Sequence, residues 1–321
     1  MGQGRQYRIG SFNVNRLSRS NATRFRAEQI ADIIMHEQMD IVALQEVLDE
    51  DALHPIKSCL GSGWESFWLN SRPKKGMRDY DHDPGGEGYA FLWDRRRLRK
   101  VQADTMDGKD GNFDPCIYNR YAVNRKKGQQ ELIRDPVYGR FTPQGLGGGN
   151  FELRIICAHI RYNGLDEESD RFLWPMRQNE FEVLTQTLYP MLADMVYGAQ
   201  MPSYTVLLGD YNMSLKRLWT KKPYIDTPDE GIVLDDKRII TVQDQLTTLK
   251  KPKKKDETTR GYKHNYDHFS YDMNRFKAVQ PHVERVDVVG SSYYTAFYDN
   301  YDRYRDEISD HVPVMMTITP G

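Results

Sequence analysis

Tyr204-Thr205-Val206-Leu207-Leu208-Gly209-Asp210 is a short apolar run that stops at an acidic residue. Its length and its β-branched and aromatic content predict a buried β-strand that ends at Asp210. Five further segments follow the same pattern, since each is short and carries a polar residue at one end. They are residues 7–14, 40–47, 89–93, 153–159 and 312–318. The chain is therefore predicted to be rich in short strands with at least one buried face.

Helical patterns separate some of these strands. A first apolar stripe follows Asn21 and Thr23, either of which can cap a helix. It consists of Ala27, Ile30, Ile33 and Ile34. A second stripe predicts a helix near Gln178 to Val196, with Gly198 as its stop, and it consists of Leu184, Leu188, Met191 and Leu192. Because no internal repeat or linker-like stretch separates the elements, we predict one α/β domain over residues 1–321.

The composition is ordinary for a soluble globular protein. The 321 residues are 39% hydrophobic and 28% charged, which excludes disorder and a fibrous repeat. With 45 basic and 46 acidic residues the net charge is −1, so the chain as a whole lacks a cationic footprint for nucleic acid. No run approaches the roughly 20 apolar residues of a membrane helix, and residues 1–6 lack the apolar segment of a signal peptide. We expect a soluble, cytoplasmic protein without membrane contact, and a monomer.

The cysteines and several histidines show no pattern that indicates chemistry. The three cysteines are odd in number and lack metal-site spacing, so they are predicted to be buried free thiols; they are Cys59, Cys116 and Cys157. A group of histidines outside the strand ends is predicted to lie on the surface or in loops. It consists of His54, His82, His264, His268 and His282.

Hydrogen-bonding or acidic residues stand where four of the predicted strands stop. These are Asn13, Glu46, His159 and Asp210. Each alone is more simply interpreted as an ordinary residue at a strand edge. Together with Asn212 and Ser309-Asp310-His311, they supply the carboxylate and amide oxygens that Mg²⁺ and Ca²⁺ prefer, and two imidazoles that can relay protons. The set therefore predicts a site for a hard cation and a phosphate.

Five short motifs occur in the order and spacing of the endonuclease/exonuclease/phosphatase superfamily. They are Phe12-Asn13-Val14, Leu44-Gln45-Glu46-Val47, Ala158-His159-Ile160, Gly209-Asp210-Tyr211-Asn212 and Ser309-Asp310-His311-Val312-Pro313-Val314. Any one of them is a weak signal, but five in order, spanning essentially the whole chain, are specific. The resemblance implies an α/β (α+β) four-layer sandwich, in which two packed mixed β-sheets are flanked by helices. The site is then expected at the edge where strand ends from both sheets meet.

Finer features resemble the deoxyribonuclease I branch of this superfamily. Glu87-Gly88-Tyr89-Ala90-Phe91-Leu92 is similar to a segment whose glutamate supports the first histidine, which implies a Glu87–His159 pair. Tyr266-Asp267-His268-Phe269 is similar to the strand that supports the second histidine, which implies an Asp267–His311 pair. Asp287, in Arg285-Val286-Asp287, is the rival partner. Asn15 stands where deoxyribonuclease I has an arginine, so minor-groove contact by that residue is not carried over.

The resemblance also implies a role for each site residue. Glu46, with Asn13, Asp210 and Asp310, would hold Mg²⁺; Mn²⁺ is an alternative, and Ca²⁺ is a candidate structural ion. Arg120 and Asn212 would bind the oxygens of the substrate phosphate. His159, His311, Glu87, Asp267 and Asp210 would be the catalytic set. The resemblance leaves open which histidine acts as base and which as acid.

The predicted activity is metal-dependent hydrolysis of phosphodiesters, with double-stranded DNA cut internally by a nuclease of deoxyribonuclease I type. The alternative is a phosphatase or phosphodiesterase that acts on a small phosphate ester or a phospholipid headgroup, because such enzymes share the metal and histidine motifs. A catalytically silent binding module is a third interpretation. Three polar segments, residues 70–88, 124–150 and 249–262, are predicted to be long loops around the cleft.

Overall fold

The structure is a computed structural model, and it describes most of the chain. The described residues are 4–70, 87–101, 116–117, 132, 134, 136–145, 150–160, 177–196, 201–214, 225–227, 231–233, 239–243, 245–251 and 261–320. Gly198, Arg120, and much of the predicted loops 70–88, 124–150 and 249–262 lie outside these ranges. The prediction of a loop over 124–150 is wrong in its described part, because Val137–Pro143 forms a buried strand.

The first β-sheet combines the two ends of the chain. Its strands in spatial order are β14 (His282–Arg285), β15 (Val314–Ile318), β1 (Tyr7–Leu17), β2 (Ile41–Val47), β4 (Gly88–Asp94) and β3 (Trp64–Asn70). Within it, β1 runs parallel to β2 and antiparallel to β15. The sheet is therefore mixed, as predicted. It also brings the segments around Asn13 and Glu46 next to each other on neighbouring strands.

The second sheet contains the predicted strand that ends at Asp210. Its strands in spatial order are β10 (Ile225–Thr227), β11 (Gly231–Val233), β12 (Ile239–Val242), β13 (Asp267–Asp272), β9 (Ser203–Asp210), β8 (Glu152–His159), β7 (Val137–Pro143) and β5 (Leu98–Lys100), and β6 (Cys116–Ile117) pairs with β7. Parallel pairing of β8 with β9 sets His159 beside Asp210. Antiparallel pairing of β9 with β13 sets Asp210 beside Asp267. Three predicted site residues thus lie side by side across three adjacent strands.

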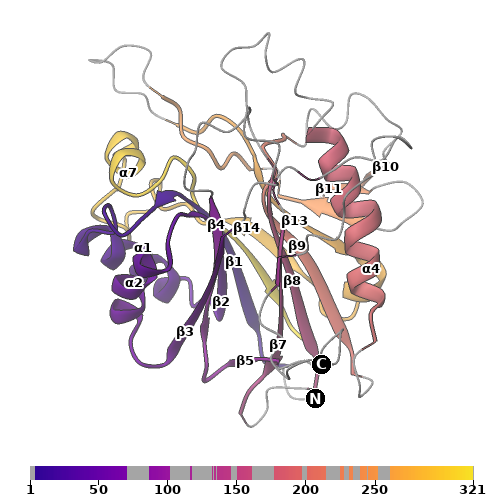
Figure 1. The fold of residues 1–321 in the computed structure, drawn as a ribbon. Coiled ribbons are helices and arrows are strands. Elements are labelled where there is room, and N and C mark those ends of the chain that lie inside the picture. The colour runs from indigo at the N-terminus through magenta and orange to yellow at the C-terminus, as the bar shows by residue number, and fades with distance from the viewer. Residues whose placement is uncertain are drawn as a thin grey trace, which may run out of the picture.

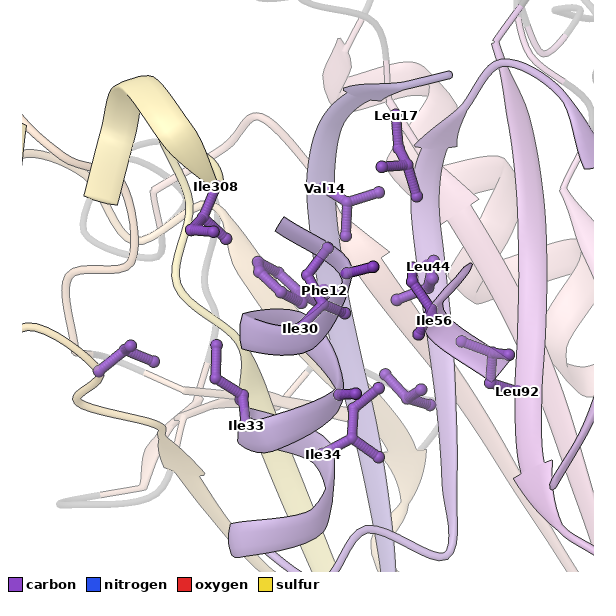
Figure 2. Packing of buried hydrophobic residues seen from close by; sticks show 14 of the residues in the cluster. Phe12, Val14, Leu17, Ile30, Ile33, Ile34, Leu44, Ile56, Leu92 and Ile308 are labelled. Carbon is purple, nitrogen blue, oxygen red and sulfur yellow. The ribbon is translucent and has the colours of Figure 1, made fainter. Parts of the chain in front are cut away.

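Helices cover the outer face of the first sheet (Figure 1). These are α1 (Arg24–His36), α2 (Leu53–Leu60), preceded by a short 3₁₀ turn (Glu50–Ala52), and α7 (Tyr301–Glu307). Thr23 caps α1, since its side chain accepts a hydrogen bond from the Arg26 backbone N–H. Figure 2 shows the apolar stripe of α1, including Ile30 and Ile34, packed against Phe12 and Leu44 of the sheet.

The outer face of the second sheet is covered by the helix predicted near Gln178 to Val196. Its described part is α-helical over 177–183, forms a π-helical turn at Leu184–Leu188, and continues as α4 (Tyr189–Asp194). The short helix α6 (Met273–Phe276) follows β13. Among the described helices, none is long and apolar enough to span a bilayer.

An apolar cluster fills the space between the two sheets. It draws Ile9 and Phe91 from the first sheet, and Ile155, Val206 and Phe269 from the second. With helices on both outer faces, this confirms the predicted four-layer sandwich. Because the central core takes residues from both halves of the chain, it supports one domain over residues 1–321, which stays a prediction.

Two predictions about burial are wrong. Cys157 is buried, as expected, but Cys59 is exposed, because it lies on the outward face of α2. His268 was expected on the surface or in a loop, yet it is fully buried in the central strand β13. Its ring nitrogens lie 3.0 Å from the Gln243 carbonyl oxygen and 2.9 Å from that of Met213.

Candidate active site

Asn13 joins the two sheets at the edge where the predicted strand ends meet. Its side-chain NH₂ donates to Glu46 Oε1 at 2.9 Å and to Asp210 Oδ2 at 3.0 Å. Its amide oxygen accepts from the Asn15 backbone N–H at 3.0 Å. The reversed amide would set an oxygen against two carboxylates, so this orientation is the favourable one. In this arrangement the Asn13 amide holds the two carboxylates together. Its role as a metal ligand stays a prediction.

Irregular backbone at the strand ends directs side chains into the site. Glu46 has a φ of 60°, and the pairing of β2 with β4 shifts register between Gln45 and Val47. Asn212, which follows β9, has a φ of 49°. Non-glycine residues rarely adopt positive φ, and bulges that redirect one side chain are frequent beside active sites. Two of the non-glycine residues with positive φ, Glu46 and Asn212, therefore lie where the sequence predicted chemistry.

His159 lies between Glu87 and the carboxylates of the sheet edge. Its Nδ1 is 3.2 Å from Glu87 Oε2, and its Nε2 is 3.5 Å from Asp210 Oδ2. Arg134 also enters this group, with Nη1 at 2.8 Å from His159 Nδ1 and Nη2 at 2.8 Å from Glu87 Oε2. Burial acts to raise the pKa of Glu87, but the hydrogen bond and charge of His159, together with Arg134, lower it to about 2.

The contacts of His159 cannot all be hydrogen bonds at one time. Asn212 Nδ2, a donor, is 3.2 Å from His159 Nε2, and the donor Arg134 faces Nδ1. An imidazole carries at least one N–H, so it cannot accept at both nitrogens. The consistent arrangement has Nδ1–H donating to Glu87 and Nε2 accepting from Asn212. In that arrangement the Arg134 nitrogen nearest the ring needs another acceptor.

His311 forms a second histidine–carboxylate pair. Its Nδ1 is 2.8 Å from Asp267 Oδ2, which also accepts from Thr247 Oγ1 at 2.6 Å, and its Nε2 is 3.6 Å from Asp210 Oδ2. Burial works against the imidazolium, but the charges of Asp267 and Asp210 raise the pKa of His311 well above its usual value. Asp287, the rival partner, instead accepts a hydrogen bond from Tyr262. The geometry therefore selects Asp267.

The carboxylates form a donor set that fits a divalent cation. Two groups of side chains have ligand atoms within 4.8 Å of one another, namely Glu46 with Glu87 and His159, and Asp210 with Asp267 and His311. Burial raises the pKa of both Glu46 and Asp210, so their negative charge is incompletely compensated by the protein. Oxygen ligands with uncompensated charge suit Mg²⁺ or Mn²⁺. Asp310 is partly exposed and outside both groups, although its charge helps to raise the His311 pKa.

The structure thus brings together most of the predicted site residues. Arg120 lies outside the described residues, so its predicted contact with phosphate stays a prediction. Sequence reasoning missed Arg134 and Thr247. Arg134 stands in the polar segment 124–150, immediately before β7, and its only signal was a basic residue near the start of a strand. Thr247 had no signal, because its role depends on where Asp267 lies.

The family model for the Endonuclease/Exonuclease/phosphatase family matches residues 10–311. The chain belongs to this family. The match begins in β1 and ends at His311, so it includes both histidine–carboxylate pairs. No curated protein matches the sequence. Membership places the chain among hydrolases of phosphate esters, a group that includes nucleases and phosphatases.

Solved structures share the family fold at low sequence identity. The human nocturnin catalytic domain with bound sulfate has a TM-score of 0.55 and 15% identity, covering 99% of this chain and 96% of that one. D. rerio TDP2 complexed with a single-strand DNA product has a TM-score of 0.52 and 12% identity, covering 98% and 99%. The Bacteroides thetaiotaomicron mannosyl-6-phosphatase Bt3783 has a TM-score of 0.50 and 14% identity, covering 97% and 99%. These likenesses establish the fold alone.

Proposed function

We propose that the chain is a metal-dependent nuclease that hydrolyses phosphodiester bonds within DNA. One observation carries the proposal: the Nε2 atoms of His159 and His311 lie 3.5 and 3.6 Å from the same atom, Asp210 Oδ2. Each ring has a carboxylate at Nδ1 on its other side. Two oriented imidazoles that face one small volume suit a reaction in which one proton is removed and another is delivered.

The contacts of the two rings favour different roles. His159 with its Nδ1–H directed to Glu87 has an unprotonated Nε2, which accepts from Asn212 here. It is therefore the base that takes a proton from the attacking water once Asn212 turns to the phosphate. His311 holds its proton, because Asp267 and Asp210 raise its pKa well above the usual value, and it is therefore the acid that protonates the leaving oxygen. Asp210 lies between the rings and orients both.

Glu46 and Asp210 are the carboxylates that would hold the cation, with Asp310 as a further ligand from the partly exposed side. Mg²⁺ or Mn²⁺ bound there supplies positive charge that polarises the phosphate and offsets the charge that develops on its oxygens. Asn13 fixes the two carboxylates relative to each other. We assign no site to Ca²⁺.

Arg134 is the described residue best placed to bind a phosphate oxygen. Its Nη1 lies against His159 Nδ1, a position that it must leave when Nδ1–H donates to Glu87. A phosphate oxygen beside the ring would give Nη1 a charge-assisted hydrogen bond. Asn212 is a second candidate, since its NH₂ group is held at the site by the Ile160 carbonyl oxygen at 2.8 Å.

The choice of DNA over a small ester rests on the resemblance of the segments around Glu87 and Asp267 to the deoxyribonuclease I branch. A TDP2 structure of the same fold holds single-strand DNA, which is compatible with this choice. The alternative, a phosphatase or phosphodiesterase for a small phosphate ester or a phospholipid headgroup, is kept because the mannosyl-6-phosphatase shares the fold. The two histidine pairs would serve either substrate, so an experiment must separate them.

The test is nicking of supercoiled plasmid in Mg²⁺, Mn²⁺ or EDTA. We expect metal-dependent nicking that falls about 10²-fold or more in His159→Ala, since a group that transfers a proton in the transition state contributes at least this much. His282→Ala is the matched control, because His282 is an exposed histidine on the edge strand β14. Wild type that leaves DNA and RNA intact but hydrolyses a small phosphate ester would replace the nuclease with the alternative.

A further inference from the structure

A pocket lies beside the candidate active site, between the end of β1 and helix α7. Its volume is about 740 Å³, within the range of roughly 300–1,000 Å³ that is typical of ligand sites. We call it the flanking pocket and define it by six of its lining residues. These are Asn15, Arg16, Phe25, Arg26, Arg303 and Ile308.

The flanking pocket shares its wall with the active site. The Arg16 backbone N–H donates to Glu46 Oε2 at 3.1 Å, and the Asn15 backbone N–H donates to the Asn13 side chain at 3.0 Å. On the other side, Ile308 directly precedes Ser309, whose hydroxyl donates to the Asn13 carbonyl oxygen at 2.7 Å. A polymeric substrate with its reacting phosphate at Glu46 would therefore extend past this pocket.

Arg26 gives the pocket a buried positive charge. Its side chain is only 7% exposed, and its Nη2 donates to backbone carbonyl oxygens, including Asn15 at 3.0 Å and Ile308 at 2.7 Å. Nε is buried without a hydrogen-bond partner, and Glu46 is the carboxylate whose charge acts on Arg26. A guanidinium held by carbonyl oxygens keeps its positive charge, which attracts an anion.

Arg303 and Phe25 pack on each other in the wall of the pocket. The Arg303 guanidinium lies 5.2 Å from the centre of the Phe25 ring and 5.8 Å from that of Phe297. Two carboxylates also line the pocket, but each is paired, Glu307 with Arg303 at 3.0 Å and Asp306 with Arg305 at 3.3 Å. Among the described residues, Arg26 has no such carboxylate within ion-pair distance. Aromatic rings and guanidinium planes are the groups on which proteins stack nucleobases.

We propose that the flanking pocket binds the nucleotide next to the scissile phosphate, with its base against Phe25 and Arg303 and its phosphate facing Arg26. The proposal rests on the proposed nuclease function and specifies its substrate. A small phosphate ester fills only the site around Glu46 and the histidines. A nucleic acid also fills the pocket, which would give the enzyme a means of preferring a polymer.

The test compares two charge reversals on matched arginines. Arg303→Glu changes the pocket, and Arg24→Glu is its control. Arg24 is one residue before Phe25, its side chain is 92% exposed, and it pairs with Glu28 four residues on, as Arg303 pairs with Glu307. Both variants change the net charge equally and break one exposed helical ion pair. They differ in that Arg303 lines the pocket and packs on Phe25 and Phe297, whereas Arg24 does not line it.

Binding of a fluorescein-labelled single-stranded hexanucleotide, measured by anisotropy in EDTA, reports on the pocket without turnover. Loss of one stacked base should raise the Kd of Arg303→Glu about tenfold above that of Arg24→Glu. Hydrolysis of bis(p-nitrophenyl) phosphate should be equal in both variants. Circular dichroism melts of both establish that they fold.

The outcomes separate the pocket from the chemistry. Equal Kd values for the two variants, or no binding of the hexanucleotide by wild type, would refute nucleotide binding in the flanking pocket. Binding that depends on Arg303, with no metal-dependent cleavage of the same oligonucleotide, would support nucleotide binding in the flanking pocket and refute the proposed nuclease activity. If Arg303→Glu slows hydrolysis of the oligonucleotide and of bis(p-nitrophenyl) phosphate equally, nucleotide binding in the flanking pocket is also refuted. Arg303 would then affect the active site whatever the substrate.

Discussion

Asp267→Asn tests whether His311 owes its proton to the charge of Asp267. Asp267 Oδ2 accepts from both Thr247 Oγ1 and His311 Nδ1, whereas Oδ1 is buried without a hydrogen-bond partner within the described residues. An asparagine oxygen in the Oδ2 position keeps both hydrogen bonds. The substitution therefore removes the negative charge while the ring keeps its orientation and its Nδ1–H.

The expected change follows from the His311 pKa. In wild type that pKa is well above the ordinary value of 6.5, and Asp267 is the largest favourable cause. Loss of that charge lowers the His311 pKa, so in the variant the protonated fraction falls over a pH range in which the wild-type ring stays protonated. A general acid must be protonated, so the alkaline limb of kcat/KM moves to lower pH. The wild-type to variant rate ratio is then small near pH 6 and grows with pH.

Two measurements check this prediction: an NMR titration of the His311 ring and the pH profile of kcat/KM on an oligonucleotide. Asp287→Asn is the control, because that carboxylate accepts from Tyr262 and pairs with Arg285, and among the described residues it forms no hydrogen bond or ion pair with His311. An unchanged His311 titration in Asp267→Asn would refute the electrostatic argument. Parallel pH profiles with a shifted titration would instead remove His311 from the role of acid.

Two further predictions concern the backbone at Asp210 and the contact of Arg134. Gly209→Ala should lower the free energy of unfolding by about 3 kcal/mol or more, because Gly209 has a φ of 138° and an added Cβ would stand 1.9 Å from the Ala158 carbonyl oxygen. Urea unfolding beside Gly261→Ala, where φ is 106° but the nearest atom is 3.7 Å away, isolates the clash, and equal losses in the two variants would refute it. Arg134→Met should raise KM for a phosphodiester about tenfold or more, as expected for one lost charge-assisted hydrogen bond. Steady-state kinetics with an unchanged KM would exclude phosphate binding by Arg134.

The sequence identified the strand ends because those positions have a local signal. A short apolar run that stops at a polar residue is visible in any single segment, and β9 with Asp210 is the clearest case. Which polar residues meet is a property of sheet order. The choice between Asp267 and Asp287 was left open for that reason, and it was decided by the pairing of Asp267 with Asp210 across β13 and β9.

The residues that sequence reasoning misjudged depend on long-range packing. His268 alternates with Asp267 on the same strand, so it points to the opposite face, where backbone carbonyl oxygens of Met213 and Gln243 receive its ring. The position of His268 next to a site residue in the sequence does not indicate that its ring is buried. Arg134 was missed because the segment around it has no periodic pattern. Its place in the site depends on the ion pair with Glu87.

Asn13 shows how the fold couples the two halves of the site. Its NH₂ group holds Glu46 of the first sheet and Asp210 of the second, and Asp210 in turn faces both histidines. Burial of the two carboxylates raises their pKa values, so the edge of the sandwich is organised at a cost in stability that a bound cation would offset. Because one amide sets the distance between these carboxylates, a shift of one sheet against the other would disturb cation binding and proton transfer together. The shared apolar core between the sheets would therefore support the proposed catalysis, since it holds the two sheets that carry these carboxylates in place.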